Sequence, residues 1–283
     1  AEQMDDTGAT LQAEMTAMGR RAREAAVALR LASAETRTAA IAAMAAAVRA
    51  DAAAILSANA AAVAAAKAAG LTDAMVDRLV LDEGRLEGVA QALETVAAIP
   101  DPVGAEMDRW TRPNGLDIAR VRTPIGVIGI IYESRPNVTA DAAALCVRAG
   151  NVAILRGGSE CLQSNLAIHA AGAKGLKSAG LPEACVQVVR TADRAAVGMM
   201  LGGLDKAIDL IIPRGGKSLV ARVQQEARVA VLGHLEGLNH VFLHASADPA
   251  KAVTVTVNAK MRRVSVCGAA ETLLVDRAVA RTH

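Results

Sequence analysis

Aromatic residues are almost missing from this 283-residue chain, which holds only Trp110, Tyr132 and Phe242. Nucleic-acid-binding proteins commonly stack bases on aromatic side chains and carry an excess of basic residues. Here 31 Lys and Arg residues nearly balance 29 Asp and Glu residues, for a net charge of +2. The composition therefore argues against a nucleic-acid-binding protein.

Cysteine is also scarce, and long apolar runs are absent. Cys146, Cys161, Cys185 and Cys267 are too few and too scattered for a disulfide scaffold, and they form no zinc-like motif. We therefore expect free thiols in a reducing cytoplasm and no metal site. No apolar run reaches the roughly 18 residues that a membrane-spanning helix needs, and no apolar signal core follows the N-terminus.

Alanine, by contrast, is abundant, with 65 residues, 35 of them among the first 100. Because alanine has the highest helix propensity, this region is expected to be helical. The spacing of the larger apolar residues predicts helices over 11–31, 35–50 and 51–69, and a further helix from about Asp82 to just before Pro100.

Residues 101–123 have a different pattern, typical of a β-hairpin. Two extended stretches, 103–110 and 116–123, flank the sequence Arg-Pro-Asn-Gly at 112–115, and Asn-Gly is a strong turn signal. We expect a polar-sided arm that assembles copies of the chain into a homo-oligomer.

Residues 124–247 alternate short apolar strands with helical segments, which predicts an α/β fold with a parallel sheet covered on both faces. The expected strands are 126–132, 152–155, 186–189, 208–212 and 229–232, with 241–243 beyond. The expected helices between them are 139–149, 161–179, 193–201 and 217–226. From Asp248 a new unit begins with a helix over 249–257. Such sheets bind ligands at the carboxyl ends of their strands.

Two of these strands end in matching loops, Arg156-Gly157-Gly158 and Arg214-Gly215-Gly216. Glycine lets the backbone approach a ligand, a helix N-terminus offers free amides, and arginine adds a fork for phosphate. The pair predicts a dinucleotide site, although the GxGxxG fingerprint is absent. The alternative is that the glycines only form tight turns.

Asn137 and Cys267 are the candidates for covalent chemistry. The Asn137 amide follows a strand and either stabilises an oxyanion or caps the next helix. Cys267 follows the cations Lys260, Arg262 and Arg263, and nearby cations favour the nucleophilic thiolate. A lone cysteine is more often structural, and Cys146 and Cys185 have the apolar neighbours of small core residues.

Several long motifs together resemble the gamma-glutamyl phosphate reductase family, within the aldehyde dehydrogenase superfamily. These motifs are residues 124–129, 132–139, 154–158, 212–216 and 257–275, with 59–60 and 71–79 upstream. The resemblance implies an aldehyde dehydrogenase-like α/β fold with a helical N-terminal region, a parallel-sheet cofactor domain and the start of a second α/β catalytic domain. The domains would be 1–247, binding NADP, and 248–283, the first part of a catalytic domain that is apparently incomplete.

The resemblance also implies an activity and a set of site residues. The activity is NADPH-dependent reduction of L-glutamyl 5-phosphate to L-glutamate 5-semialdehyde in proline biosynthesis, with a possible link to glutamate 5-kinase. Cys267 would be the nucleophile and Asn137 the oxyanion donor. The implied cofactor residues are Arg156, Gly157, Gly158, Pro213, Arg214, Gly215 and Gly216. The implied substrate residues are Arg135, Lys260 and Arg263.

The sequence departs from this family in two ways. Family members continue well past residue 283, so we expect the chain alone to bind NADPH weakly, to turn over poorly and to associate. Many members also carry cysteine at the position of Asn239, which puts a role for that residue in doubt. Two alternatives remain, a catalytically incomplete nucleotide-binding fragment and a CoA-acylating aldehyde dehydrogenase.

Overall fold

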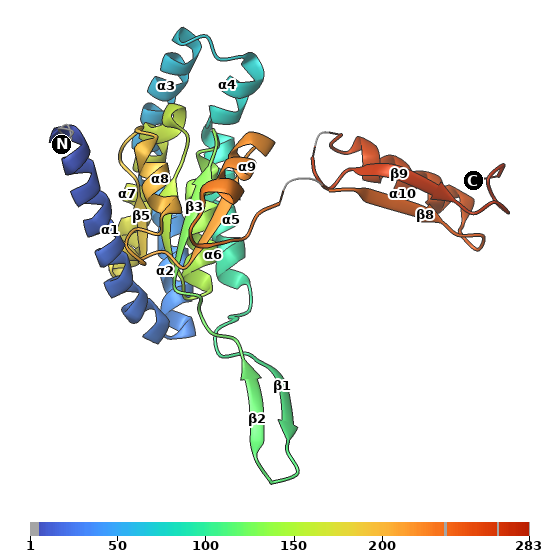
Figure 1. Ribbon diagram of the computed structural model, residues 1–283. Coiled ribbons are helices and arrows are strands. Elements are labelled where there is room, and N and C mark those ends of the chain that lie inside the picture. Colours follow the sequence, from blue (N-terminus) through green and yellow to red (C-terminus); the bar gives the residue numbers. More distant parts are fainter. Residues whose placement is uncertain (1–5, 235–236, 265, 283) are drawn as a thin grey trace. The chain divides into compact units, whose positions relative to one another are not determined.

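The computed structural model describes residues 6–234, 237–264 and 266–282. They form two compact units that divide between Gly233 and His234 (Figure 1). The boundary predicted from the sequence lies later, after residue 247. The roles assigned to the two domains remain predictions.

The N-terminal region is helical, as its alanine content predicts. Its helices are α1 (Asp6–Leu31), α2 (Ala34–Ala50), α3 (Ala52–Ala68), α4 (Asp73–Leu79) and α5 (Glu83–Ala98). The side chains of Ser33, Thr72 and Asp82 cap the N-termini of α2, α4 and α5. The seven-residue helix α4 was not predicted, because it is too short to show a helical period.

The core of the first unit is a five-stranded parallel sheet in the order β5-β4-β3-β6-β7, as the alternating pattern predicted. Its strands are β3 (Val127–Tyr132), β4 (Val152–Arg156), β5 (Val186–Val188), β6 (Leu210–Arg214) and β7 (Ala230–Val231). All six residues of β3 are buried, which fits the central position of this strand.

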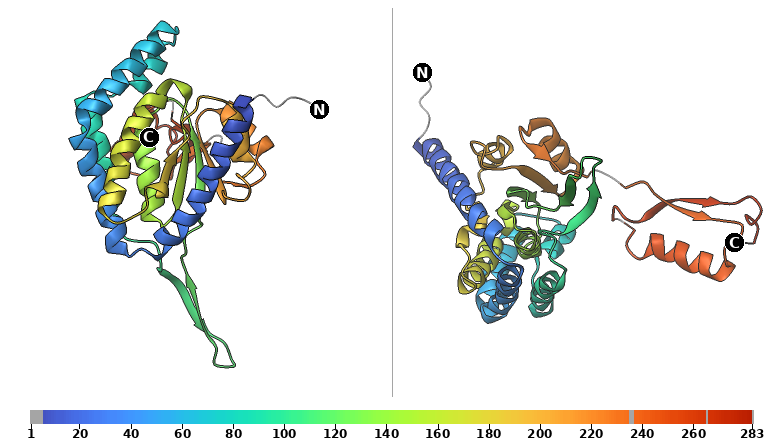
Figure 2. Two further views of the ribbon diagram at one scale, coloured as in Figure 1. Left: turned by 90° about the vertical axis from the view of Figure 1, so that its left-hand side faces the viewer. Right: turned by 90° about the horizontal axis from the view of Figure 1, so that it is seen from below.

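Helices cover both faces of this sheet (Figure 2). On one face lie α6 (Asn137–Arg148) and α7 (Leu162–Ser178), with α2 and α5 in a further layer outside them. On the other face lie α8 (Ala195–Leu201) and α9 (Lys217–Glu226). Gly175 lets α7 approach α2 closely, because a Cβ atom at this position would lie 2.4 Å from the Met44 nitrogen.

The predicted hairpin is present as β1 (Glu106–Thr111) and β2 (Asp117–Val121), which pair antiparallel (Figure 1). Gly115 has a φ of 83°, so its lack of a Cβ atom suits the turn. Every residue of β1 is exposed. The first unit therefore leaves this arm without packing partners of its own.

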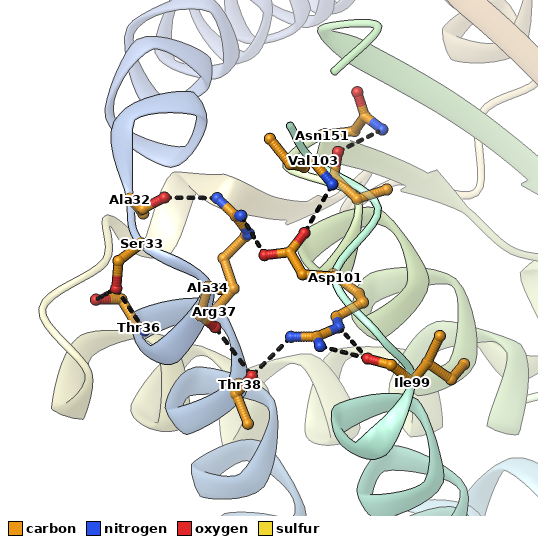
Figure 3. A network of polar contacts seen from close by, with 12 residues as sticks. Ala32, Ser33, Ala34, Thr36, Arg37, Thr38, Ile99, Asp101, Val103 and Asn151 are labelled. Atoms are coloured by element: carbon orange, nitrogen blue, oxygen red, sulfur yellow. Dashed lines mark hydrogen bonds and ion pairs between the residues drawn. The ribbon is translucent and has the colours of Figure 1, made fainter. Parts of the chain in front are cut away.

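A buried polar network anchors the base of the hairpin to α2 (Figure 3). The buried Arg37 donates hydrogen bonds to the Ala32 carbonyl at 2.6 Å and to Asp101 Oδ2 at 2.5 Å. The other Asp101 oxygen accepts from the Val103 amide at 2.8 Å. Burial opposes ionisation of Asp101, but the Val103 amide and the Arg37 guanidinium outweigh it and lower the pKa of this carboxyl.

Asp101→Asn is expected to lower the free energy of unfolding by about 2–3 kcal/mol, because it leaves the buried Arg37 without its counter-ion. A lowered pKa stabilises the fold above the unfolded pKa, and this stabilisation is lost as pH falls through the folded pKa. The difference from wild type should therefore shrink in acid. Denaturant unfolding across pH measures it, with Asp117→Asn in the exposed Arg109–Asp117 pair as the control. Equal effects of the two substitutions at neutral pH would contradict this role.

The second unit contains β8 (Asn239–Leu243), α10 (Pro249–Met261) and β9 (Ala270–Val275). The two strands pair in parallel and α10 packs against both. The prediction that residues 241–243 extend the first sheet is wrong, since they belong to β8 and pair with β9. An apolar run indicates a buried strand but does not specify its partner.

Within the described residues, no single helix is long and apolar enough to cross a bilayer. The consecutive helices α2 and α3 pass that test only as a pair, and they meet at a bend of 69°.

Candidate active site

The polar residues at the carboxyl edge of the parallel sheet surround a hollow of about 460 Å³. Glu133, Ser134 and Arg135 follow β3, and Arg214 ends β6. The remaining lining residues are Met75, Arg78, Glu160, Gly215 and Gly216. The structure therefore brings together the Arg214 loop and the Arg135 segment that the sequence analysis had singled out separately.

The glycines of the Arg214 loop admit a neighbouring carboxylate. A Cβ atom on Gly215 would lie 2.6 Å from Glu133 Cδ, and the Gly216 amide donates to Glu133 Oε2 at 3.0 Å. The backbone amide of Gly216, the residue just before α9, is therefore already hydrogen-bonded to the Glu133 carboxylate. Neither glycine has a positive φ, so the turn alone does not require them. Pro213 lies buried in β6, next to Ile131 of β3.

The Arg156 loop is shaped in the same way by its neighbours. A Cβ atom on Gly157 would lie 2.1 Å from Asn165 Nδ2, and one on Gly158 would lie 2.1 Å from Glu160 Oε1. Arg156 donates to the Gly157 carbonyl at 2.8 Å and to the Ala192 carbonyl at 3.0 Å, while its buried Nε atom has no partner. Burial lowers the pKa of Arg156, which is the expected direction for a desolvated cation.

Asn137 is the first residue of α6, and its side chain does not cap that helix. Its Nδ2 atom instead donates to Asp141 Oδ2, one turn further along, at 3.0 Å. The interpretation of Asn137 as a helix cap is therefore wrong. An amide Nδ2 carries two hydrogens, so one donor remains for an oxyanion. Asp141 is half-buried, and burial raises the pKa of its carboxyl even though the Asn137 amide opposes the shift.

Cys267 lies in a turn of the second unit, just before β9, and its side chain is exposed. Lys260 is in the last turn of α10, and Arg263 follows that helix; both are exposed. These three residues belong to the same unit, as their sequence spacing predicts. That the cations activate the thiol, and that they contact substrate, remain predictions.

Asn239 and Gly237 contact the turn that contains Cys267. The Asn239 side-chain amide donates to the Cys267 carbonyl and, at 3.2 Å, to the Ala269 carbonyl. A Cβ atom on Gly237 would lie 2.1 Å from the Cys267 carbonyl oxygen. Asn239 thus has a structural role that the sequence analysis did not assign.

The other three cysteines are buried in the first unit. Burial raises the pKa of Cys146 to about 12, of Cys185 to about 12 and of Cys161 to about 11. A neutral, enclosed thiol is a poor nucleophile. The prediction that Cys146 and Cys185 are small core residues fits this burial.

Some polar residues near the predicted site were missed because they converge only in the folded chain. Arg78 comes from the unpredicted helix α4 and lines the same hollow as Arg214. Glu133 and Glu160 fill the space beside the glycines. Asp141 had a usable signal, since residues four apart on a helix are neighbours and Asn137 had already been singled out.

Comparison with known proteins supports the resemblance. A model of the aldehyde dehydrogenase family matches residues 2–283. A gamma-glutamyl phosphate reductase of Caulobacter sp. strain K31 is 73% identical over 96% of this chain and 65% of its own length. The crystal structure of the gamma-glutamyl phosphate reductase of Thermotoga maritima is 42% identical, with a TM-score of 0.87 over 94% of this chain and 64% of that one.

An acetylating aldehyde dehydrogenase of Geobacillus thermoglucosidasius shares the fold at 18% identity, with a TM-score of 0.63. The chain spans slightly less than two thirds of the length of the two reductases. The predicted aldehyde dehydrogenase-like fold is confirmed by these structural matches and by the family model. This chain belongs to the aldehyde dehydrogenase family.

Proposed function

We propose that the protein containing this chain reduces L-glutamyl 5-phosphate to L-glutamate 5-semialdehyde with NADPH and releases phosphate, the second step of proline biosynthesis. The observation that carries the proposal is the 73% identity to the Caulobacter gamma-glutamyl phosphate reductase over 96% of this chain. The exposed Cys267 and the polar carboxyl edge of the sheet supply residue types that this chemistry needs.

Cys267 is the proposed nucleophile. Its thiolate attacks the acyl carbon of glutamyl phosphate, a C–S bond forms, and the C–O bond to phosphate breaks with its electron pair leaving on phosphate. The product is a thioester on Cys267. Asn239, through the Cys267 and Ala269 carbonyls, holds the turn in one conformation during this attack. Arg135, Lys260 and Arg263 are the proposed contacts to the anionic substrate.

Asn137 is the proposed oxyanion donor. Its contact with Asp141 fixes the amide on the first turn of α6, so its second hydrogen is available without reorganisation. The same donor stabilises negative charge on the carbonyl oxygen when phosphate leaves and again when the thioester is reduced. Collapse of that second tetrahedral species expels the Cys267 thiolate and gives the aldehyde.

The residues at the sheet edge fit a phosphorylated dinucleotide. The orphaned Nε of Arg156 and the exposed guanidinium of Arg214, beside the hollow, offer donors to phosphate oxygens. Gly157, Gly158, Gly215 and Gly216 add no side chains of their own to the two loops. The carboxylates of Glu133 and Glu160 fill the space beside them, so a bound phosphate has to displace these side chains. Bound there, NADPH supplies the hydride that reduces the thioester.

Arg156→Ala is expected to weaken NADPH binding about tenfold more than NADH binding, since an arginine pairs with a 2′-phosphate that NADH lacks. Both cofactors should also weaken somewhat, because the side chain supports the Gly157 and Ala192 carbonyls. Fluorescence titration of each cofactor measures the two effects. The exposed Arg190, on the segment after β5, provides the matched Arg→Ala control. An equal loss for both cofactors would assign Arg156 to structure alone.

Phosphate release tests the proposed reaction directly. The full-length protein should oxidise NADPH and release one phosphate per aldehyde formed when it receives glutamyl phosphate from glutamate 5-kinase and ATP. A CoA-acylating enzyme would instead require an acyl-CoA, and an incomplete nucleotide-binding fragment would bind NADPH without turnover. Either result would overturn the proposal.

The free thiols of the chain are compatible with the cytoplasm, which is the proposed compartment.

The hairpin is the proposed assembly element, and its partner is a second copy of the chain. Met107, Trp110 and Leu116 are exposed on this arm, and Trp is a residue type enriched at interfaces. Trp110→Asp is expected to lower the mass measured by light scattering toward that of a monomer. The unfolding temperature of the monomer should not change. An unchanged oligomeric mass would place the interface elsewhere.

A further inference from the structure

A second hollow lies beside Asn137 and is lined by charges of both signs. Its volume is about 330 Å³, and it is bounded by α4, the start of α5 and α6. The carboxylates on its wall are Asp77 and Asp141, and the guanidiniums are Arg78, Arg85 and Arg135. A site with fixed positive and negative groups suits a ligand that carries both charges itself.

The two carboxylates differ in how they are compensated. Asp77 is exposed and pairs with Arg85 at 2.7 Å. Asp141 is half-buried and accepts from Asn137, and no described residue forms an ion pair with it. Burial raises the pKa of Asp141, so the carboxylate is held in an environment that opposes its charge. A buried carboxylate without a cation is unfavourable unless a ligand supplies one.

Arg78 is the complementary cation among the residues that line this hollow. It forms no ion pair or side-chain hydrogen bond with the described residues, and it lines both hollows. The backbone around it is anchored by the buried Asn59, which donates to the Leu79 carbonyl at 2.8 Å and accepts from the Leu81 amide at 2.7 Å. Arg78 is therefore an exposed cation on a fixed backbone.

We propose that Asp141 binds the α-ammonium group of the amino-acid substrate, while Arg78 faces its α-carboxylate. This inference rests on the proposed function and names the part of the substrate that the hollow recognises. The contact between Asp141 and Asn137 then links recognition of the head group to the amide that faces the reacting carbonyl. A substrate without the amino group leaves the Asp141 carboxylate uncompensated.

The test compares two aldehydes in the oxidative direction with the full-length protein, NADP⁺ and phosphate. L-Glutamate 5-semialdehyde carries the amino group, and 5-oxopentanoate has the same chain without it. At matched concentrations of open-chain aldehyde, wild type is expected to favour the amino substrate by about 100-fold in kcat/KM. The reason is that a site that pairs with a polar group of its substrate discriminates strongly against an analogue without that group.

Asp141→Asn should reduce this preference to less than about tenfold, mainly through a higher KM for the amino substrate. Asp77→Asn is the matched control, since Asp77 lines the same hollow but already has Arg85 as its partner. It should keep most of the preference. A proportional loss for both aldehydes in Asp141→Asn would overturn the inference, as would equal use of the two aldehydes by wild type.

The outcome separates this inference from the proposed function. If both aldehydes are oxidised at equal rates in a phosphate-dependent reaction, the inference about Asp141 is wrong and the proposed function stands. If neither aldehyde is oxidised in a phosphate-dependent reaction, both the inference and the proposed function are wrong. Folding of the variant is checked by thermal unfolding. A raised carboxyl pKa stabilises the fold in acid, and this stabilisation is lost as pH rises through the folded pKa. Asp141→Asn should therefore be at least as stable as wild type at neutral pH.

Discussion

Cys267→Ser is expected to lower glutamyl phosphate reduction by about a thousandfold or more in the full-length protein, because a serine hydroxyl is a far weaker nucleophile at neutral pH. Affinity for NADPH should stay within about twofold of wild type, since the proposed cofactor residues lie in the other unit. Stopped-flow phosphate release measures the chemical step, and fluorescence titration measures the cofactor.

The buried cysteines provide the controls for this substitution. Cys146→Ala and Cys185→Ala change thiols that are enclosed in the core, so they should affect stability more than the chemical rate. Iodoacetamide followed by mass spectrometry should label the exposed Cys267 much faster than Cys146, Cys161 or Cys185. Full activity in Cys267→Ser would remove this residue from the mechanism.

Asn137→Ala is expected to lower the chemical rate by about 10²–10³, the usual effect of removing one oxyanion donor. The substitution also removes the hydrogen bond to Asp141 and leaves that half-buried carboxylate without its protein donor. Single-turnover kinetics should therefore show a loss in rate that is much larger than any loss in cofactor affinity.

Asn151→Ala separates this chemical effect from a general loss of stability. Asn151 is buried in the same unit, and its Oδ1 atom accepts from the Gly126 amide at 2.9 Å, at the opposite end of β3. Its removal should lower the unfolding temperature and leave the single-turnover rate close to wild type. If Asn137→Ala behaves like Asn151→Ala, Asn137 has no role as an oxyanion donor.

The helices and most of the strands of this fold could be predicted from local sequence. High alanine content specifies α1, α2 and α3, and apolar runs such as Val127–Tyr132 specify buried parallel strands. Local pattern failed at α4, which is too short to show a period, and at β8, whose partner is β9 and not the first sheet. Strand pairing depends on contacts distant in sequence.

The candidate site also has residues that could be predicted from local sequence and contacts that could not. The Arg-Gly-Gly loops, Asn137 and Cys267 could be singled out because their residue types and their places after strands or among cations carry chemical meaning. The contact of Asn137 with Asp141 follows from their spacing on α6. The convergence of Arg78 on the same hollow depends on how α4 and α6 come together in the folded chain. The reason for the glycines was also hidden, since Glu133, Glu160 and Asn165 fill the space beside them.

A glutamyl thioester on Cys267 is the most direct test of the central claim. Full-length protein is incubated without NADPH while glutamate 5-kinase and ATP generate glutamyl phosphate, and the protein is then digested in acid and analysed by mass spectrometry. The proposed mechanism predicts one glutamyl adduct, on Cys267, that disappears when NADPH is added and is absent from Cys267→Ser. Turnover without an adduct on Cys267, or an adduct on another residue that NADPH discharges, would contradict it.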